Sequence, residues 1–159
     1  MVRDILGDDF DGMLVSDCLS SYGPAQYAKH KCIAHHLRAI SEAMKYPHTD
    51  EDKYLLAWKS FFHVVIALYH LRQVISEEDF AHKRKLMESW RDKLLNEIVS
   101  QPGDVSVRNR PAKQHRHLLG CLYEPLAEPT NNRADRALRA AVISRKLSGG
   151  NKTERGRDC

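Results

Sequence analysis

The sequence predicts one predominantly helical domain with one or two short strands and a helical hairpin. Three observations support this fold class. A short apolar run at 12–17 is typical of a buried strand, apolar stripes at helical spacing fill residues 49–100, and a basic segment from about residue 132 carries apolar side chains at helical intervals. The length of 159 residues fits a single domain with one core.

Two strands are expected near the N-terminus. The run GMLVSD at 12–17 enters from a glycine, contains the β-branched Val15 and closes on Asp17. A second strand is expected at 30–34, and it passes into a helix that Pro47 ends.

A helical hairpin is expected in the middle of the chain. Thr49 is a candidate N-cap for its first helix, and Ser76 opens the second as the first residue of a Ser-x-x-acid capping box. The first stripe contains Leu55, Trp58, Phe62, Val65, Leu68, Tyr69 and Val74. The second helix, at 77–100, has a stripe made of Phe80, Met87, Trp90, Leu94 and Ile98. Two antiparallel helices would bury these stripes against each other.

The later part of the chain is expected to contain two further helices. QPGD at 101–104 predicts a turn, and the stretch before residue 112 predicts an irregular connection. A third helix is expected from Pro111 to about Tyr123, because proline favours the first helical position. EPLAEPTNN then breaks it, and the basic helix begins near Asn132.

Charge is concentrated near the C-terminus. The net charge is +4, but residues 129–157 contain eight Arg or Lys against two acids, a net of +6. Such a segment indicates a contact with a polyanion such as nucleic acid, because Lys and Arg bind phosphates. The alternative is a solvated basic tail with no specific partner.

Two carboxylates stand out by their position. On a helical wheel Asp135 falls on the same side as Leu138 and Val142, where a carboxylate needs a partner or a metal. An ion pair with Arg139 at i,i+4 is the simpler explanation. Asp17, at the C-terminal end of a strand, either caps the following turn or belongs to a site. Together the carboxylate oxygens of the two acids could bind a divalent cation that prefers oxygen ligands.

Other classes of protein are disfavoured. The chain has no P-loop, G-x-G-x-x-G or G-x-S-x-G motif, and its four cysteines include no C-x-x-C pair. The pattern formed by His30, Cys32, His35 and His36 lacks the second ligand pair that a zinc site needs. Neither a membrane span nor a signal peptide is recognised, so a cytoplasmic protein is expected.

Two blocks of the sequence resemble a known family. GMLVSDCLSSY with KCIAHHLRAI, and EPTNNRADRALRAAVISRKLSGGNKTERG, resemble the catalytic domain of DDE transposases of the insertion-sequence-66 type. The resemblance implies an RNase H-like domain, α/β by ancestry, in which three acids hold Mg²⁺ for phosphoryl transfer on DNA. It implies that Asp17 is the second acid and that Asp135 is the third.

The same resemblance divides the chain and assigns its partners. It implies a partial RNase H-like core at 1–48, a helical insertion and approach at 49–123, and a third-acid helix with a basic segment at 124–159. DNA at insertion-sequence ends is the implied partner, and further copies or an intact transposase are additional ones. The implied DNA-binding residues are Arg133, Arg136, Arg139, Arg145 and Lys146.

The chain also differs from the family pattern. In the family the first acid lies on an earlier strand, whereas only 16 residues precede Asp17, and the third acid is a glutamate. We therefore expect a truncated transposase domain that does not catalyse transposition by itself. The alternative function is a non-enzymatic helical protein that binds DNA or a transposase, and an incomplete sheet would favour a poorly folded product.

Overall fold

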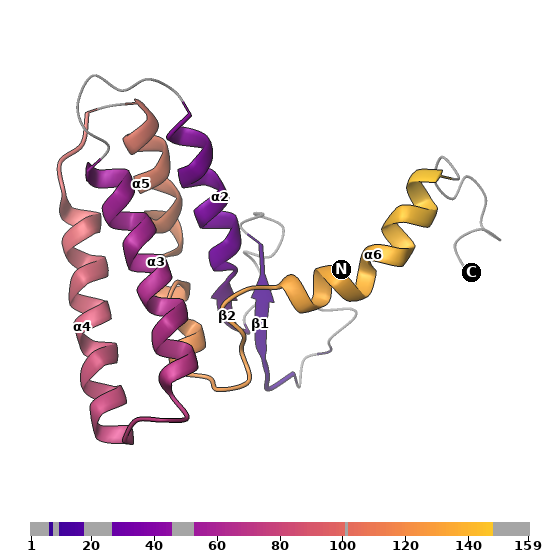
Figure 1. Ribbon diagram of the computed structural model, residues 1–159, viewed down its shortest axis with the longest axis horizontal. Coiled ribbons are helices and arrows are strands. Elements are labelled where there is room, and N and C mark those ends of the chain that lie inside the picture. Colours follow the sequence, from indigo (N-terminus) through magenta and orange to yellow (C-terminus); the bar gives the residue numbers. More distant parts are fainter. Residues whose placement is uncertain (1–6, 8–9, 18–26, 46–52, 101, 148–159) are drawn as a thin grey trace.

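A computed structural model describes residues 7, 10–17, 27–45, 53–100 and 102–147 (Figure 1). Within the last range, the side chains of residues 102, 135, 140–142 and 144–147 lie outside the description. The chain order is β1 (Met13–Ser16), β2 (Ala28–Lys31), α2 (Ile33–Ala43), α3 (Lys53–Leu71), α4 (Glu77–Asn96), α5 (Pro102–Gln114), the short 3-10 helices η2 (His115–His117) and η3 (Gly120–Leu122), and α6 (Asn132–Leu147). The protein is thus mostly helical, with a two-stranded sheet.

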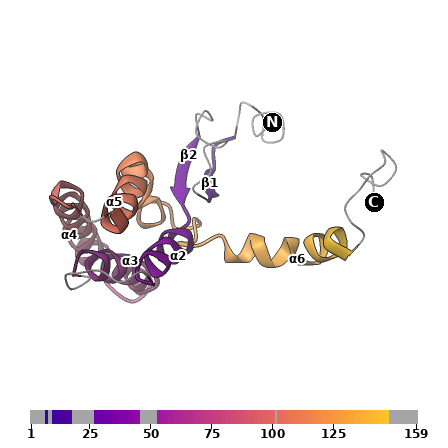
Figure 2. The same cartoon turned by 90° about the horizontal axis from the view of Figure 1, so that it is seen from above.

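Helices α2 to α5 pack side by side as a bundle (Figures 1 and 2). The core centres on the aromatic side chains of α3, where Trp58 lies 5.4 Å from Phe61 and 5.5 Å from Phe62 between ring centroids. Trp90 of α4 contacts this cluster, with its ring centroid 5.6 Å from that of Phe61, and Phe80 of the same helix is completely buried. The predicted hairpin is therefore confirmed as α3 and α4.

The ends of the hairpin helices differ in part from the prediction. Ser76 caps α4 as predicted, since its hydroxyl accepts a hydrogen bond from the Asp79 backbone N–H at 3.1 Å. Val74 and Ile98 are 74% and 95% exposed, so their assignment to the buried stripes was wrong. Both lie beyond the helix ends, where the helical period no longer directs side chains to the core. Thr49 lies outside the described residues.

The sheet consists of two parallel strands. Met13 pairs with Ala28 and Ser16 pairs with Lys31, and the Cys32 N–H donates to the Ser16 carbonyl oxygen at 2.8 Å. The first predicted strand is confirmed, but the second lies at 28–31 instead of 30–34. Residues 33 and 34 are helical because Ile33, His36 and Ile40 recur at helical spacing on the buried face of α2. That helix ends at Ala43, before Pro47, which lies outside the described residues.

Helix α5 corrects the prediction of a turn and an irregular connection at 101–110. It starts at Pro102 and continues through Pro111 to Gln114, where a helix was expected only from Pro111. Val107 and Pro111, four residues apart, are both buried against the bundle. This burial offsets the hydrogen bond that a proline removes from a helix interior. Residues 115–122 form η2 and η3 instead of the predicted end of a third helix.

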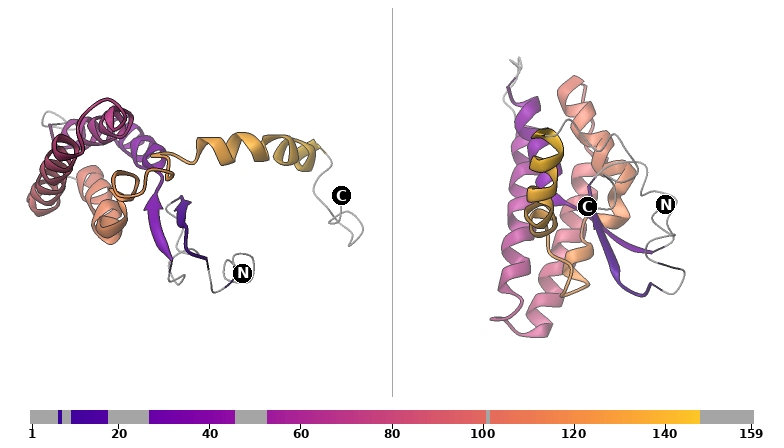
Figure 3. Two further views of the ribbon diagram at one scale, coloured as in Figure 1. Left: turned by 90° about the horizontal axis from the view of Figure 1, so that it is seen from below. Right: turned by 90° about the vertical axis from the view of Figure 1, so that its right-hand side faces the viewer.

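Helix α6 projects away from the bundle and the sheet, as all the views show (Figures 1, 2 and 3). Its start at Asn132 confirms the prediction. Leu138, on the side predicted to be apolar, is 60% exposed, so its expected burial was wrong, and Ile143 is 50% exposed. The side chains of Asp135 and Val142 lie outside the description. In the part of the chain that the structure describes, no layer covers Leu138 and Ile143.

Within the part of the chain that the structure describes, one helix has the length and composition of a membrane span. Helix α3 passes that test, but so do core helices of soluble proteins. Its buried side chains form the centre of the bundle, as expected of a core helix; they are Tyr54, Leu55, Trp58, Phe61, Phe62, Val65 and Leu68.

Candidate functional site

The predicted acid of the first block lies at the edge of the sheet. Asp17 directly follows Ser16, the last residue of β1, and is partly exposed. Val15, two residues earlier in the strand, is partly buried as well. The strand-end position predicted for Asp17 is confirmed.

The two sequence blocks meet where β2 ends and α2 begins. The Pro129 carbonyl oxygen accepts hydrogen bonds from the Ile33 N–H at 2.9 Å and from His30 Nε2 at 3.1 Å. Beside it, the Cys32 thiol donates to Asn131 Oδ1 at 2.8 Å, and the Asn131 N–H donates to Cys32 Sγ at 3.3 Å. These four bonds dock the segment before α6 onto the Cys-x-x-His segment, a contact that the sequence did not reveal.

An open groove of about 360 Å³ lies between β1 and the beginning of α6. Val15 borders it from the strand and Ala134 borders it from the helix. Val15 lies two residues before the predicted acid Asp17, and Ala134 directly precedes the predicted acid Asp135. The remaining lining residues are Leu126, Glu128, Thr130, Asn131, Arg133 and Ala137. The backbone positions of both acids therefore lie near one groove.

The side chain of Asp135 lies outside the described residues. Neither its predicted ion pair with Arg139 nor its predicted metal ligation is tested. Among the described side chains, no three of His, Cys, Asp or Glu gather as metal ligands. Glu128 and Thr130 contribute side-chain oxygen atoms to the lining of the groove, and oxygen is the ligand type that Mg²⁺ prefers, so the groove has donors that suit this ion.

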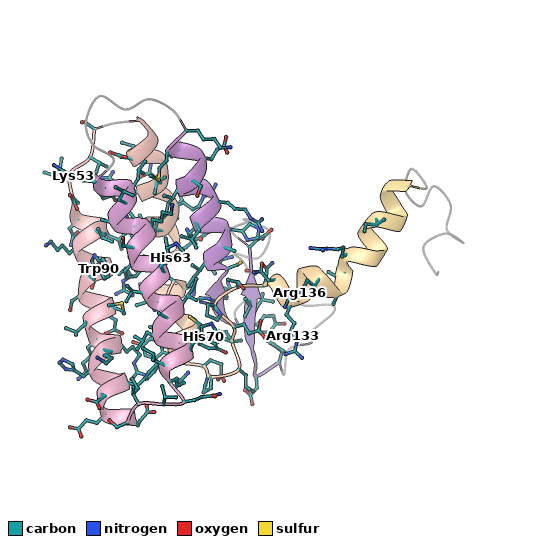
Figure 4. All side chains as sticks on the ribbon, viewed as in Figure 1. Lys53, His63, His70, Trp90, Arg133 and Arg136 are labelled. Atoms are coloured by element: carbon teal, nitrogen blue, oxygen red, sulfur yellow. The ribbon has the colours of Figure 1, made fainter. Side chains whose placement is uncertain are left out.

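Three predicted DNA-binding residues are exposed on α6. Arg133, Arg136 and Arg139 recur every third residue, which places them along neighbouring positions of the helix surface. Figure 4 shows Arg133 and Arg136 at the end of α6 that lies next to the sheet. Arg133 pairs loosely with Glu128 at 3.6 Å, and its side chain is 82% exposed. Arg145 and Lys146 belong to α6, but their side chains lie outside the description.

The histidines of the first block lie in the interior. Burial lowers the pKa of His30 to about 4 and the pKa of His36 to about 3, so both rings are neutral at pH 7. His36 stacks on Phe62 with ring centroids 5.0 Å apart. His30 and Cys32 bind the segment before α6, and His36 packs in the core. In the described structure these three side chains thus serve packing and docking.

The comparisons with known proteins give one result. The family model described as "Transposase IS66 family" matches residues 1–158, nearly the whole chain. Neither the curated proteins nor the solved structures include a match.

Proposed function

The chain belongs to the IS66 transposase family, and we propose that it takes part in DNA transposition by divalent-metal-dependent phosphoryl transfer. The proposed site is the groove between β1 and α6. One observation carries this assignment: four hydrogen bonds dock the segment before α6 onto Cys32 and its neighbours, which brings the two acid-bearing segments to one groove.

The proposed acids of this site are Asp17 and Asp135, the second and third acids of the family pattern. Asp17 lies at the carboxyl end of a parallel strand, where α/β folds place their sites. Mg²⁺ bound by both carboxylates would polarise the phosphate and activate the attacking oxygen. Binding of Mn²⁺ as a probe, weakened by Asp17→Asn and by Asp135→Asn, tests the ligand assignment without requiring activity.

The proposed DNA-binding surface is the basic side of α6. Arg133, Arg136 and Arg139 are exposed and closely spaced, and Arg145 and Lys146 follow on the same helix. Phosphate contacts of this kind bind DNA without reading its sequence. A DNA partner also agrees with the proposed cytoplasmic location.

The proposed architecture is a part of an RNase H-like domain. The part at 1–48 would be the partial core, in which the two parallel strands belong to the sheet and a helix follows them. The bundle at 49–123 would be the helical insertion and approach. The part at 124–159 would carry the third acid. The parallel pairing of β1 and β2 supports this assignment, because RNase H-like sheets contain parallel strands.

We further propose that the isolated chain does not cleave DNA. Asp135 is one methylene shorter than the glutamate of the family pattern, and the described side chains form no cluster of three metal ligands. A Mg²⁺-dependent cleavage assay on insertion-sequence ends is expected to show no product. Robust cleavage that Asp17→Ala abolishes would overturn this part of the proposal.

A second candidate function is DNA binding without catalysis, and the exposure of the α6 arginines supports it. The test is the dependence of DNA affinity on salt. Each phosphate contact removed is expected to lower the slope of log K against log salt by about 0.9, so Arg136→Gln with Arg139→Gln reduces it by roughly two. The matched control is Lys83→Gln with Lys85→Gln, two exposed changes on α4. Equal slopes for the two double variants would exclude the α6 surface.

A further inference from the structure

Lys31 is a buried lysine at the edge of the sheet where Asp17 lies. It is the last residue of β2, pairs in register with Ser16 and is only 4% exposed. Its Nζ donates to Ser16 Oγ at 3.0 Å and to the Asp17 carbonyl oxygen at 2.9 Å. The Ser16 hydroxyl donates to the same carbonyl at 3.2 Å. Two donors therefore converge on the carbonyl group of Asp17.

Stability does not explain a lysine at this position. Lysine is almost never fully buried, because removing its ammonium group from water is costly. An apolar side chain of similar length would pair β2 with β1 at no such cost, and replacing buried charges in this way is often neutral or stabilising. What the ammonium group adds is a fixed orientation for the carbonyl group of Asp17, directly after β1.

We propose that Lys31 is a positioning residue for Asp17. The inference rests on the proposed function, in which the Asp17 carboxylate binds a divalent cation in the groove. Lys31 and Ser16 hold the Asp17 carbonyl group on the β2 side of the strand end. With its carbonyl fixed, the Asp17 backbone is limited in its conformations, which would hold the carboxylate at the strand end, two residues from Val15 of the groove lining.

The first test measures the order of the strand end. Lys31→Met keeps the length of the side chain and removes the charge, whereas Ser16→Ala removes the hydroxyl and leaves the charge in place. Both variants are expected to accelerate amide hydrogen exchange at the end of β1, while the bundle helices keep their protection. For Lys31→Met we expect a melting temperature that is unchanged or higher. Unchanged exchange at the end of β1 in both variants would overturn the proposal.

The second test measures binding of Mn²⁺ alone by titration calorimetry. Loss of a group that orients a metal ligand is expected to weaken binding about tenfold, in both Lys31→Met and Ser16→Ala. Lys83→Met, the same substitution at an exposed site on α4, serves as the control and is expected to leave the affinity unchanged. Tighter binding by Lys31→Met with no change in Ser16→Ala would show that Lys31 acts only as a repulsive charge, and it would overturn the positioning role.

The two tests separate this inference from the proposed function. If Asp17→Asn leaves Mn²⁺ binding unchanged, the metal-binding part of the proposed function is wrong. The exchange experiment then still decides whether Lys31 orders the end of β1, because it requires no metal.

Discussion

Cys32 and Asn131 lie 99 residues apart in the chain and exchange two hydrogen bonds. The Cys32 thiol donates to the side-chain oxygen of Asn131 at 2.8 Å, and the backbone N–H of Asn131 donates to the Cys32 sulfur at 3.3 Å. Asn131 directly precedes α6, which projects from the bundle, so the contact lies at the base of this helix (Figure 1). The direction of α6, and with it the position of its arginines, depends on this contact.

Asn131→Ala is therefore expected to loosen the base of α6. The substitution removes the bond from the Cys32 thiol and is expected to cost about 1 kcal/mol of unfolding free energy. Limited proteolysis is expected to cut near residue 131 faster, and DNA affinity is expected to fall. Asn132→Ala is the matched control, since the side chain of Asn132 is exposed. Identical proteolysis of the two variants would show that the Cys32 contact does not hold the helix.

Acid is expected to destabilise the protein through its buried histidines. Burial lowers the pKa of His30 to about 4 and that of His36 to about 3, whereas a histidine in the unfolded chain titrates near 6.5. Between these values the unfolded state binds more protons than the folded state, so the unfolding free energy falls as pH falls below 6.5. The expected loss is on the order of 2 kcal/mol per histidine at about pH 5. Urea unfolding at several pH values measures it.

Substituting one of these histidines separates their effect from that of other groups. His36→Phe keeps a ring against Phe62 and removes one titrating group, so the stability is expected to depend less steeply on pH below 6.5. His63→Phe is the matched control at an exposed position of α3, which is labelled in Figure 4. If both variants keep the wild-type slope, His36 is not the source of the pH dependence.

Gly120 is expected to tolerate no side chain. A Cβ atom at this position would lie 2.9 Å from the Lys29 carbonyl oxygen and 3.0 Å from His30 Cβ, so η3 would have to move away from β2. Gly120→Ala is expected to cost about 1–3 kcal/mol, the usual range for overpacking. Gly12→Ala is the comparison, because the three atoms nearest to a Cβ there all belong to the ring of Phe10, so that a side chain and not the backbone would have to move. Equal unfolding free energies for the two variants would contradict this packing.

Local signals in the sequence predicted the elements that depend on neighbouring residues. Ser76 at the start of α4, Asn132 at the start of α6 and Asp17 at the end of β1 all lie where cap, breaker and alternation patterns put them. Helix α5 was missed because the burial of Pro111 against distant residues outweighs the local effect of proline.

The candidate site was predictable only in part, because its key contacts join residues far apart in the chain. Asp17 was recognised from its strand and its family pattern. The bond between Cys32 and Asn131 and the burial of Lys31 leave no signal in any local window of the sequence. They arise only when the parallel pairing of β1 and β2 is formed and the segment before α6 is docked.

Trp58 is expected to be the most costly core residue to truncate. It is fully buried, stacks on Phe62 and makes edge contacts with Phe61 and Tyr54. Trp58→Ala is expected to cost about 3–5 kcal/mol, through lost burial and the cavity left between α3 and its neighbours. Trp58→Phe keeps an aromatic ring there and is expected to cost less.

Chemical denaturation followed by circular dichroism measures the unfolding free energies of the two Trp58 variants, and the fluorescence of Trp90 remains as a second probe. Leu56→Ala is the control on the same helix, because Leu56 is 47% exposed and its truncation opens no enclosed cavity. Since a domain of this size is stable by only about 5–15 kcal/mol, the loss of Trp58 is expected to remove a large part of that margin. Equal effects of Trp58→Ala and Leu56→Ala would mean that the aromatic cluster of α3 is not the centre of the core.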